Sequence, residues 1–346
     1  MNMEYRILSL SDLSEEYWQQ RLSPQLFEHS LVWLQATEQY VTKKRCKLHT
    51  LWCDEQLVAA LPLYQEQGFL GAKVFKNLMS FYSTEISLLT HSDFPESGQL
   101  LYDHIIEANR WHFFELGPIV NNRLKLHYFN TVVAQQTNWF IRDVDSEEAY
   151  FSARPSRLKN TLKRKNKQLT KHNYRFQIAQ DPTSVKQMFT DYQAIYQQSW
   201  KGQEFSDDFI LDLCLQAQAQ QKLCFATLYI DDTPAASQIW FTQQDQVSIF
   251  KLAYDPQFSS LSVGSLLSEY MTKHVLRHCG MRHIEFGMGD ERYKQDWMSE
   301  KQYRYCYLVF NTKSIIGILA WLRYSVMASF KKTLTGWLGK NSDDST

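Results

Sequence analysis

The sequence predicts a mixed α/β fold made of two similar units, and three observations carry that prediction. Apolar segments at 223–230, 235–242 and 246–254 follow one another with short polar connections, which is typical of an antiparallel meander. A helical segment at 264–278 then leads to another strand at 282–287, and a crossover helix there implies that the strands on either side of it lie parallel. The first part of the chain also has a hairpin, a helix and a following strand, so a repeat of one fold is expected.

The composition of the 346-residue chain is that of a globular protein with room for two domains. Hydrophobic residues make up 44% and charged residues 21%, which excludes a disordered chain. The 37 basic residues balance the 37 acidic ones, so any surface for nucleic acid has to be a local basic cluster. Aromatic residues reach 14%, which suits broad packed sheets or a site that holds an extended ligand.

The cysteines and the N-terminal segment favour a cytoplasmic protein without a metal. No cysteine pair has CxxC spacing and no His/Cys cluster along the sequence indicates zinc. Residues 1–18 contain Glu4, Arg6 and Asp12 and therefore lack the apolar core of a signal peptide. No stretch of 18 uncharged apolar residues occurs, so no membrane span is predicted. The six cysteines are Cys46, Cys53, Cys214, Cys224, Cys279 and Cys306.

The elements of the first unit follow from apolar periodicity and turn residues. Asp54 and Glu55 form a hairpin-like turn between two strand-like segments, and Gly117-Pro118 ends a short apolar run. The predicted elements are a helix at 24–40, strands at 46–53 and 56–64, a helix at 97–110, and strands at 112–116 and 138–143.

A basic stretch marks the start of the second unit. Eight Lys or Arg residues lie from Arg154 to Lys171, and no acidic residue occurs between Glu148 and Asp181. The Arg-Pro-Ser sequence that opens it is an extended lead into a helix. Further helices at 182–199 and 206–220 and a last strand at 304–310 complete the second unit. We therefore predict an N-terminal domain at 1–150, a C-terminal domain at 151–312, and an amphipathic helix and tail at 313–346.

The segment 258–267 is the first candidate site, because it follows a strand, is rich in serine and opens a helix. Small residues let a phosphate approach the backbone, and the free N–H groups of a first helical turn attract an anion. A pyrophosphate would receive several backbone hydrogen bonds there. A serine-rich helix cap without a ligand has the same pattern.

The segment 285–297 is the second candidate site, because a strand ends there in a Gly-x-Gly turn crowded with ionisable groups. Tyr293 is expected to donate a proton to a leaving thiolate, and Asp290 or Glu285 to accept one from a nucleophile. Lys294 is expected to hold a negative substrate group. A polar surface loop closed by salt bridges is the alternative interpretation.

Two further segments have a functional and a structural interpretation each. The basic stretch is able to meet the phosphates of a cofactor, of RNA or of anionic lipid, or it is a solvated helix face. The apolar segment 314–338 carries only Arg323, Lys331 and Lys332 as charges, and it suits a helix that lies on a membrane surface or packs on the protein.

Three motifs in the second unit resemble a known family. They are Lys251-Leu-Ala-Tyr-Asp255, then Leu261-Ser-Val-Gly-Ser-Leu-Leu267, then Glu285-Phe-Gly-Met-Gly-Asp-Glu-Arg-Tyr-Lys294. Their order and spacing resemble GNAT-superfamily acyltransferases of the CelD-like type, which have polysaccharide and cell-envelope functions in bacteria, and the likeness covers most of 150–310. Leu261 and Val263 stand where the family has Tyr and Pro, and Glu285 stands where it has Asp.

The resemblance implies two GNAT-like halves, as in the Fem-type aminoacyl transferases. It implies that an acyl donor enters where strands 246–254 and 282–287 splay apart, with its pyrophosphate at Ser262, Val263, Gly264 and Ser265. The expected function is transfer of an acyl group from acetyl-CoA or another acyl-CoA to an amine or hydroxyl acceptor, in polysaccharide or cell-envelope biosynthesis. The expected place is the cytoplasm, with peripheral contact at the inner face of the membrane through 314–338.

Two alternatives stay open. A Fem-like enzyme takes an amino acid from aminoacyl-tRNA, in which case the basic helix meets RNA. A non-catalytic tandem scaffold serves envelope assembly at the membrane, docked through its C-terminal helix.

Overall fold

The computed structural model describes residues 2–43, 45–199 and 203–325. Within these residues the strands form one mixed sheet of 13 strands, which confirms the predicted fold class. Across the sheet the order is β1-β2-β3-β4-β6-β13-β7-β12-β11-β10-β9-β8, and β5 pairs with β3. The strands are β1 (Met3–Leu8), β2 (Lys47–Cys53), β3 (Gln56–Gln67), β4 (Lys73–Asn77), β5 (Leu89–Thr90), β6 (Phe113–Val120), β7 (Phe129–Ile141), β8 (Tyr174–Ile178), β9 (Leu223–Ile230), β10 (Thr233–Gln243), β11 (Gln246–Tyr254), β12 (His283–Met288) and β13 (Glu300–Phe310).

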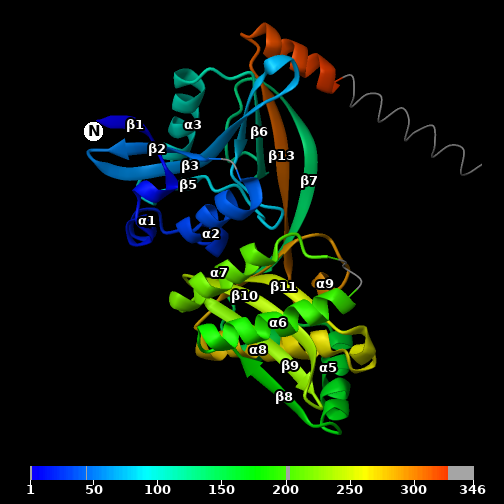
Figure 1. The fold of residues 1–346 in the computed structure, drawn as a ribbon. Coiled ribbons are helices and arrows are strands. Elements are labelled where there is room, and N and C mark those ends of the chain that lie inside the picture. Colours follow the sequence, from blue (N-terminus) through cyan, green and yellow to red (C-terminus); the bar gives the residue numbers. More distant parts are fainter. Residues whose placement is uncertain (1, 44, 200–202, 326–346) are drawn as a thin grey trace, which may run out of the picture.

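Helices cover this sheet in two groups, with α1–α3 on the N-terminal half and α5–α8 on the C-terminal half (Figure 1). We call β1–β6 with α1–α3 the N-terminal half and β8–β12 with α5–α9 the C-terminal half. The helices are α1 (Glu15–Leu22), α2 (Leu31–Ala36), α3 (Ser97–Ala108), α4 (Glu147–Ser152), α5 (Ser156–Leu169), α6 (Pro182–Gln198), α7 (Asp207–Ala219), α8 (Val263–His278) and α9 (Lys294–Trp297), with a π-helical turn at Thr37–Thr42 and a 3-10 turn at Pro256–Leu261.

Strands β7 and β13 run side by side between the two halves (Figure 1). β13, from the end of the chain, pairs with β6 of the N-terminal half. β7, from the first part of the chain, pairs with β12 of the C-terminal half. Each half is therefore completed by a strand from the other part of the chain, and the domain division at residue 150 stays a prediction.

The C-terminal half agrees closely with the sequence prediction. β9, β10 and β11 form the antiparallel meander, and β11 and β12 lie parallel around α8. The N-terminal half differs more. β6 continues through Gly117-Pro118 to Val120, and β7 starts at Phe129 instead of 138. The short strands β1, β4 and β8, which mix apolar with charged or polar residues, were not predicted.

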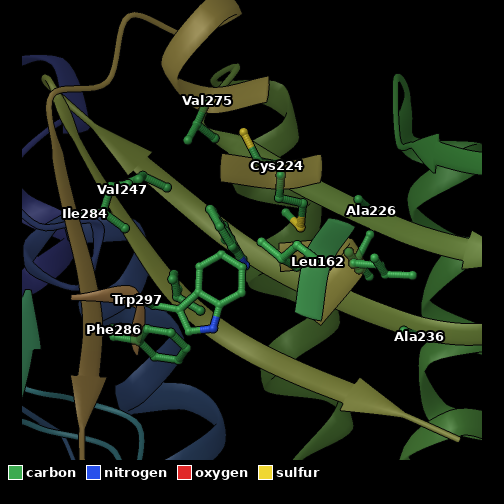
Figure 2. Packing of buried hydrophobic residues seen from close by; sticks show 14 of the residues in the cluster. Leu162, Cys224, Ala226, Ala236, Val247, Val275, Ile284, Phe286 and Trp297 are labelled. Carbon is green, nitrogen blue, oxygen red and sulfur yellow. The ribbon is translucent and has the colours of Figure 1, made fainter. Parts of the chain in front are cut away.

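Apolar side chains fill both faces of the C-terminal sheet. One core cluster lies between the sheet and α5 and α8, and another lies under α6 and α7. In the first cluster Phe286 of β12 and Trp297 of α9 lie beside one another, and Cys224 of β9 lies near Val275 of α8 (Figure 2). These clusters fix α8 against the strands whose separation forms the candidate site.

The described part of the C-terminal segment is a helix at 315–325. Its inner residues, among them Ala320 and Tyr324, pack against β6 and β13, whereas Ile315 and Leu322 are exposed. Residues 326–338 of the predicted helix lie outside the described residues, and its contact with a membrane stays a prediction. Among the helices of the described ranges, none combines the length and apolarity that crossing a bilayer takes.

Candidate active site

Strands β11 and β12 separate after three paired positions. The parallel pairing runs from Gln246 opposite His283 to Ser248 opposite Glu285. Beyond it, β11 continues to Tyr254 and β12 to Met288 without pairing to each other. Past Ser248 and Glu285 the facing edges of β11 and β12 therefore do not form a ladder with each other.

A bulge in each strand explains the separation. Ile249 pairs with Trp240 and Lys251 with Ile239, so Phe250 is an extra residue in β11. β12 bulges against β7 between Glu285 and Met288. Gly287 lies in that bulge with φ at +69°, a conformation that favours glycine. The two bulges turn the strands away from each other just past their last shared pair.

A cavity of about 640 Å³ lies on the α8 side of the gap. The first turn of α8 lines it with Gly264 and Ser265, and Tyr254 and Gln238 line it from β11 and β10. The buried Gln238 side chain donates hydrogen bonds to the Gly264 carbonyl (3.0 Å) and to Ser268 Oγ (2.9 Å). This contact holds the start of α8 against the sheet at the mouth of the gap.

A 3-10 turn leads directly into the N-terminus of α8. Pro256 begins a 3-10 turn that the Asp255 side chain caps, and Ser262 ends it in the left-handed region with φ at +54°. The amides of Ser265 and Leu266 bond to the Ser262 carbonyl. The amides of Val263 and Gly264 precede those first bonds and carry the partial positive charge of the helix end.

The four predicted cofactor residues lie together, but they differ in exposure. Gly264 and Ser265 line the cavity, whereas the Val263 side chain is fully buried in the core and Ser262 is half-buried outside the lining. Only the backbone of Val263 is therefore available to a ligand.

The basic stretch forms α5, which packs beside this cavity. Arg157 lines the cavity and pairs with Asp296 through Oδ1 (2.8 Å) and Oδ2 (2.6 Å). The Lys165 ammonium donates to the Ser260 carbonyl in the turn before α8. Arg154 does not belong to the basic surface, because it is buried and binds the Trp297 carbonyl. Five further basic residues are exposed: Lys159, Lys163, Arg164, Lys167 and Lys171.

A larger cavity of about 960 Å³ lies on the opposite side of the gap, between the two halves. The N-terminal half contributes Glu28 and the loop at 79–84, and the C-terminal half contributes Glu204, Lys251 and Glu285. Aromatic side chains form much of its wall, including Phe27, Trp33, Phe81, Tyr82, Tyr196, Phe205, Phe241, Phe250, Phe286 and Tyr293.

Three residues line both cavities: Leu252 of β11, Phe286 of β12 and Tyr293 before α9. The rings of Phe286 and Tyr293 meet edge to face, with centroids 5.5 Å apart. The two cavities therefore share part of their walls at the gap, and we call the region of these three residues the passage.

Glu285 lies at the last paired position of β12 and is buried in the wall of the larger cavity. Its carboxylate accepts hydrogen bonds from Gln246 (2.9 Å) and from Arg304 of β13 (3.1 Å). Arg304 also pairs with Glu85 (3.1 Å) and donates to the Thr84 carbonyl (3.0 Å). This buried network joins the two halves at the gap.

Glu28 is a buried carboxyl group in the same cavity that the sequence did not reveal. It accepts hydrogen bonds from the Thr84 amide (2.7 Å), the Thr84 hydroxyl (2.6 Å) and the Glu85 amide (3.0 Å). Burial raises the pKa of Glu28 to about 8, although the Thr84 hydrogen bonds and Arg304 oppose that rise. Its one sequence signal is an acidic residue inside the largely apolar segment 26–31.

A second buried group was also missed. The Lys251 ammonium pairs with Glu204 (2.8 Å) and lies 3.8 Å from the centre of the Tyr82 ring. Glu204 also accepts hydrogen bonds from the hydroxyls of Tyr82 (2.6 Å) and Tyr192 (2.7 Å). Burial raises the pKa of Glu204, but Lys251 and these hydroxyls lower it more, so the group is a fixed carboxylate in the wall.

The remaining predicted residues differ in their surroundings, although Tyr293 and Lys294 both line the larger cavity. Asp290 is exposed, lines neither cavity and accepts a hydrogen bond from Trp139 Nε1 (2.8 Å). Lys294 is buried, where its ammonium donates to the Met288 carbonyl and pairs with Glu291 (3.0 Å), and burial lowers its pKa. Tyr293 faces the passage, and burial and Glu291 raise its pKa to about 12.

Comparison with known proteins agrees with this geometry. Residues 156–295 match a family described as an acetyltransferase (GNAT) domain. This match covers the C-terminal half from the start of α5 through β12. No curated protein matches the chain in sequence. The CelD-like type is not distinguished by this match and stays a prediction.

The solved structures that resemble the chain share its fold at low sequence identity. FemX gives a TM-score of 0.60 at 8% identity and covers 90% of this chain and 98% of its own. L-PGS from Bacillus licheniformis gives 0.53 at 12% identity, with 88% and 93% covered. The C-terminal domain of a putative lysylphosphatidylglycerol synthetase from Agrobacterium fabrum gives 0.50 at 13% identity, with 81% and 89% covered.

Proposed function

We propose that this protein transfers an acyl group from acetyl-CoA or another acyl-CoA to an amine or hydroxyl acceptor, in the biosynthesis of a polysaccharide or another cell-envelope component. The observation that carries the proposal is the gap between β11 and β12, with a cavity on each side and three shared wall residues. We also propose that it works in the cytoplasm, with peripheral contact at the inner face of the membrane through 314–338.

The α8 side is the proposed donor side. A Cβ atom built on Gly264 would lie 3.5 Å from Tyr254 Cδ1, an ordinary van der Waals contact, so a side chain at this position would point along the cavity wall beside Tyr254. The N-terminal amides of α8 suit a pyrophosphate, and Arg157 lies in the same wall. Ser262 and Ser265 are sequence-predicted contacts for that pyrophosphate, and Ser265 lines the cavity.

The larger cavity is the proposed acceptor side. Its carboxylates suit an amine or hydroxyl nucleophile, and its aromatic walls suit a sugar or an apolar carrier. In the transfer, the nucleophile attacks the thioester carbonyl carbon and gives its proton to a carboxylate. The C–S bond breaks, and the thiolate takes a proton from Tyr293. Backbone amides at the separated strands are the proposed donors to the oxyanion.

Glu28 is the proposed general base. A group whose pKa lies near the working pH accepts and releases a proton efficiently, and burial gives Glu28 such a pKa. Glu285, which the sequence predicted for this role, is held by Arg304 and Gln246 in the same cavity and is the alternative base. Asp290 is the weaker candidate because it lines neither cavity.

Tyr293 is the proposed general acid. It reaches both cavities and is 48% exposed, so its hydroxyl is open to a ligand in the passage. Its raised pKa keeps it protonated at neutral pH, as an acid that protonates a thiolate has to be. Lys294, which the sequence predicted to hold a negative substrate group, lines the proposed acceptor cavity and donates to the Met288 carbonyl.

Calorimetric titration of acetyl-CoA tests the donor site. We expect Gly264→Asp to bind at least tenfold more weakly than the wild type, because its carboxylate repels a phosphate. Gly264→Asn has the same size without the charge and is the matched control, with a smaller loss. Equal heats for wild type and Gly264→Asp would remove the α8 turn from the mechanism.

A Fem-like transfer from aminoacyl-tRNA is the second candidate, favoured by the exposed basic face of α5 beside the donor cavity. It predicts tRNA binding that weakens steeply with salt and that falls in Lys163→Ala and Arg164→Ala. A wild-type protein that binds neither acetyl-CoA nor tRNA, but co-sediments with lipid through 314–338, would instead be a non-catalytic scaffold.

A further inference from the structure

Two cysteines and a histidine meet at the end of α8 that is remote from the donor cavity. Cys224 lies in β9, His274 lies in the last turns of α8, and Cys279 caps that helix. Their ligand atoms all lie within 4.8 Å of one another, and the two sulfur atoms are 4.0 Å apart. The sequence spacing predicted no such cluster, because β9 and α8 are brought together only by the fold.

The arrangement matches the chemistry of a zinc-class ion. Two sulfur ligands on a tetrahedral ion with bonds near 2.3 Å lie about 3.8 Å apart, close to the observed separation. Two thiolates and an imidazole are ligands that Zn²⁺ prefers. The C-terminal end of a helix also carries partial negative charge, which favours a cation.

The three residues differ in exposure, and the more exposed ones make the cluster accessible to an ion. Cys224 is buried beneath the helix, whereas His274 and Cys279 are half-buried at the surface. The ring of His278 lies one helical turn beyond His274, with centroids 5.3 Å apart, and His278 is exposed. The exposed side of the cluster is therefore open to solvent and flanked by a further imidazole.

We propose that Cys224, His274 and Cys279 bind one zinc-class divalent metal ion, whose fourth position faces solvent beside His278. The ion ties the end of α8 to β9. Fifteen residues of helix separate Cys279 from Gly264, a distance of about 22 Å, so the ion lies away from the transfer chemistry and acts as a structural link.

Titration of the reduced, metal-free protein with Co²⁺ tests the proposal. We expect one Co²⁺ per chain, with a thiolate-to-cobalt charge-transfer band and the visible bands of tetrahedral cobalt, and displacement by Zn²⁺. Cys279→Ser, Cys224→Ser and His274→Gln should each weaken binding at least tenfold or abolish the bands. Cys214→Ser is the matched control, because Cys214 is a free buried cysteine in α7, and it should bind as the wild type does.

Thermal unfolding provides the second measurement. Zn²⁺ should raise the Tm of the wild type and of Cys214→Ser, and should leave that of Cys279→Ser unchanged. The His274→Gln variant keeps both thiols, so it reports on the site even where a cysteine variant fails to fold. Tetrahedral bands that persist in Cys279→Ser would overturn the proposal. So would a wild type that binds no metal and forms a Cys224–Cys279 disulfide under mild oxidation, because the pair would then be redox-active.

Discussion

The two halves of the molecule contain the same junction of parallel strands but finish it differently. In the N-terminal half β4 and β6 pair from Val74 opposite Phe113 to Lys76 opposite Glu115, three positions like those of β11 and β12. β4 then ends at Asn77, whose side chain accepts from the Gly117 amide (3.0 Å) and donates to its carbonyl (3.2 Å). In the C-terminal half β11 continues for six residues past the last pair.

The difference shows what makes a gap between strands useful. In the N-terminal half β4 has ended beside Gly117, and the buried Asn77 side chain makes the hydrogen bonds to the Gly117 amide and carbonyl. In the C-terminal half a cavity lies on each side of the gap between β11 and β12. The same strand junction is thus capped by the Asn77 side chain in one half and flanked by two cavities in the other.

A bulky side chain at the wall shared by the two cavities should have the largest effect on acyl transfer. Leu252→Trp places a bulky ring between the two cavities that Leu252 now lines, and we expect loss of acyl transfer by at least 100-fold. The measurement is release of CoA thiol with the best acceptor from a panel of amines and amino sugars. Leu252→Met conserves the volume and should keep most of the activity. A Trp variant with wild-type turnover would show that the passage is not the reaction path.

The sequence predicted the strands of the C-terminal half better than those of the N-terminal half, for a physical reason. β9 to β12 and α8 are long, apolar and bounded by turn residues, and their observed ends lie within two residues of the prediction. β4 is five residues long, and two of them are lysines, so it carries little apolar signal. It is held in the sheet by β3 and β6 and not by its own pattern.

The acceptor cavity was beyond sequence reasoning because two halves build it. Glu28 and Glu285 are distant in the chain, and both interact with Arg304 of the exchanged strand β13. No local pattern encodes that meeting. The donor side, by contrast, comes from one continuous segment, so the turn at Gly264 was predicted from local residues alone.

Removing the proposed base should have the next largest effect. Glu28→Gln should lower transfer about 100-fold near pH 8, which is typical of a lost general base. The wild-type rate should rise with pH as Glu28 loses its proton, with a midpoint near its pKa of about 8, and the variant should lack this rise. Glu285→Gln removes a negative neighbour that raises this pKa, so it should shift the midpoint to lower pH.

The equivalent position in the N-terminal half provides a control variant for Glu285→Gln. Glu115 occupies the same place in β6 as Glu285 does in β12, and it pairs with Lys76 (2.9 Å) near the surface. Glu115→Gln should leave the pH profile unchanged. If Glu285→Gln abolishes activity at every pH while Glu28→Gln keeps the rise, Glu285 is the base.

Stability gives an independent check on Glu28. Its pKa is raised on folding, so the stabilisation from its protonated form is present below about pH 4.5 and is lost as pH rises through about 8. Urea unfolding of the wild type should therefore show a loss of stability over that range that is smaller in Glu28→Gln. Parallel curves for the two proteins would mean that Glu28 is ionised throughout.

Removing the proposed acid should have a smaller effect. Tyr293→Phe keeps the ring contact with Phe286 but loses the hydroxyl, and we expect turnover to fall about tenfold with unchanged acetyl-CoA affinity. The loss should shrink with an acyl donor whose thiol is more acidic, because that leaving group needs less help from an acid. An equal loss for both donors would assign Tyr293 to positioning alone.

Removing the Asn77 side chain from the N-terminal junction should have the smallest effect on function. Asn77→Ala leaves the buried Gly117 amide and carbonyl without their side-chain partners, and this should lower the free energy of unfolding by about 1–3 kcal/mol. Acetyl-CoA affinity should stay unchanged, because the donor cavity belongs to the other half. Gln65→Ala, an exposed change on the neighbouring β3, is the control for stability and should alter it by less. If Asn77→Ala instead gains a second equivalent of acetyl-CoA in calorimetry, the N-terminal junction is a latent donor site that the Asn77 side chain closes.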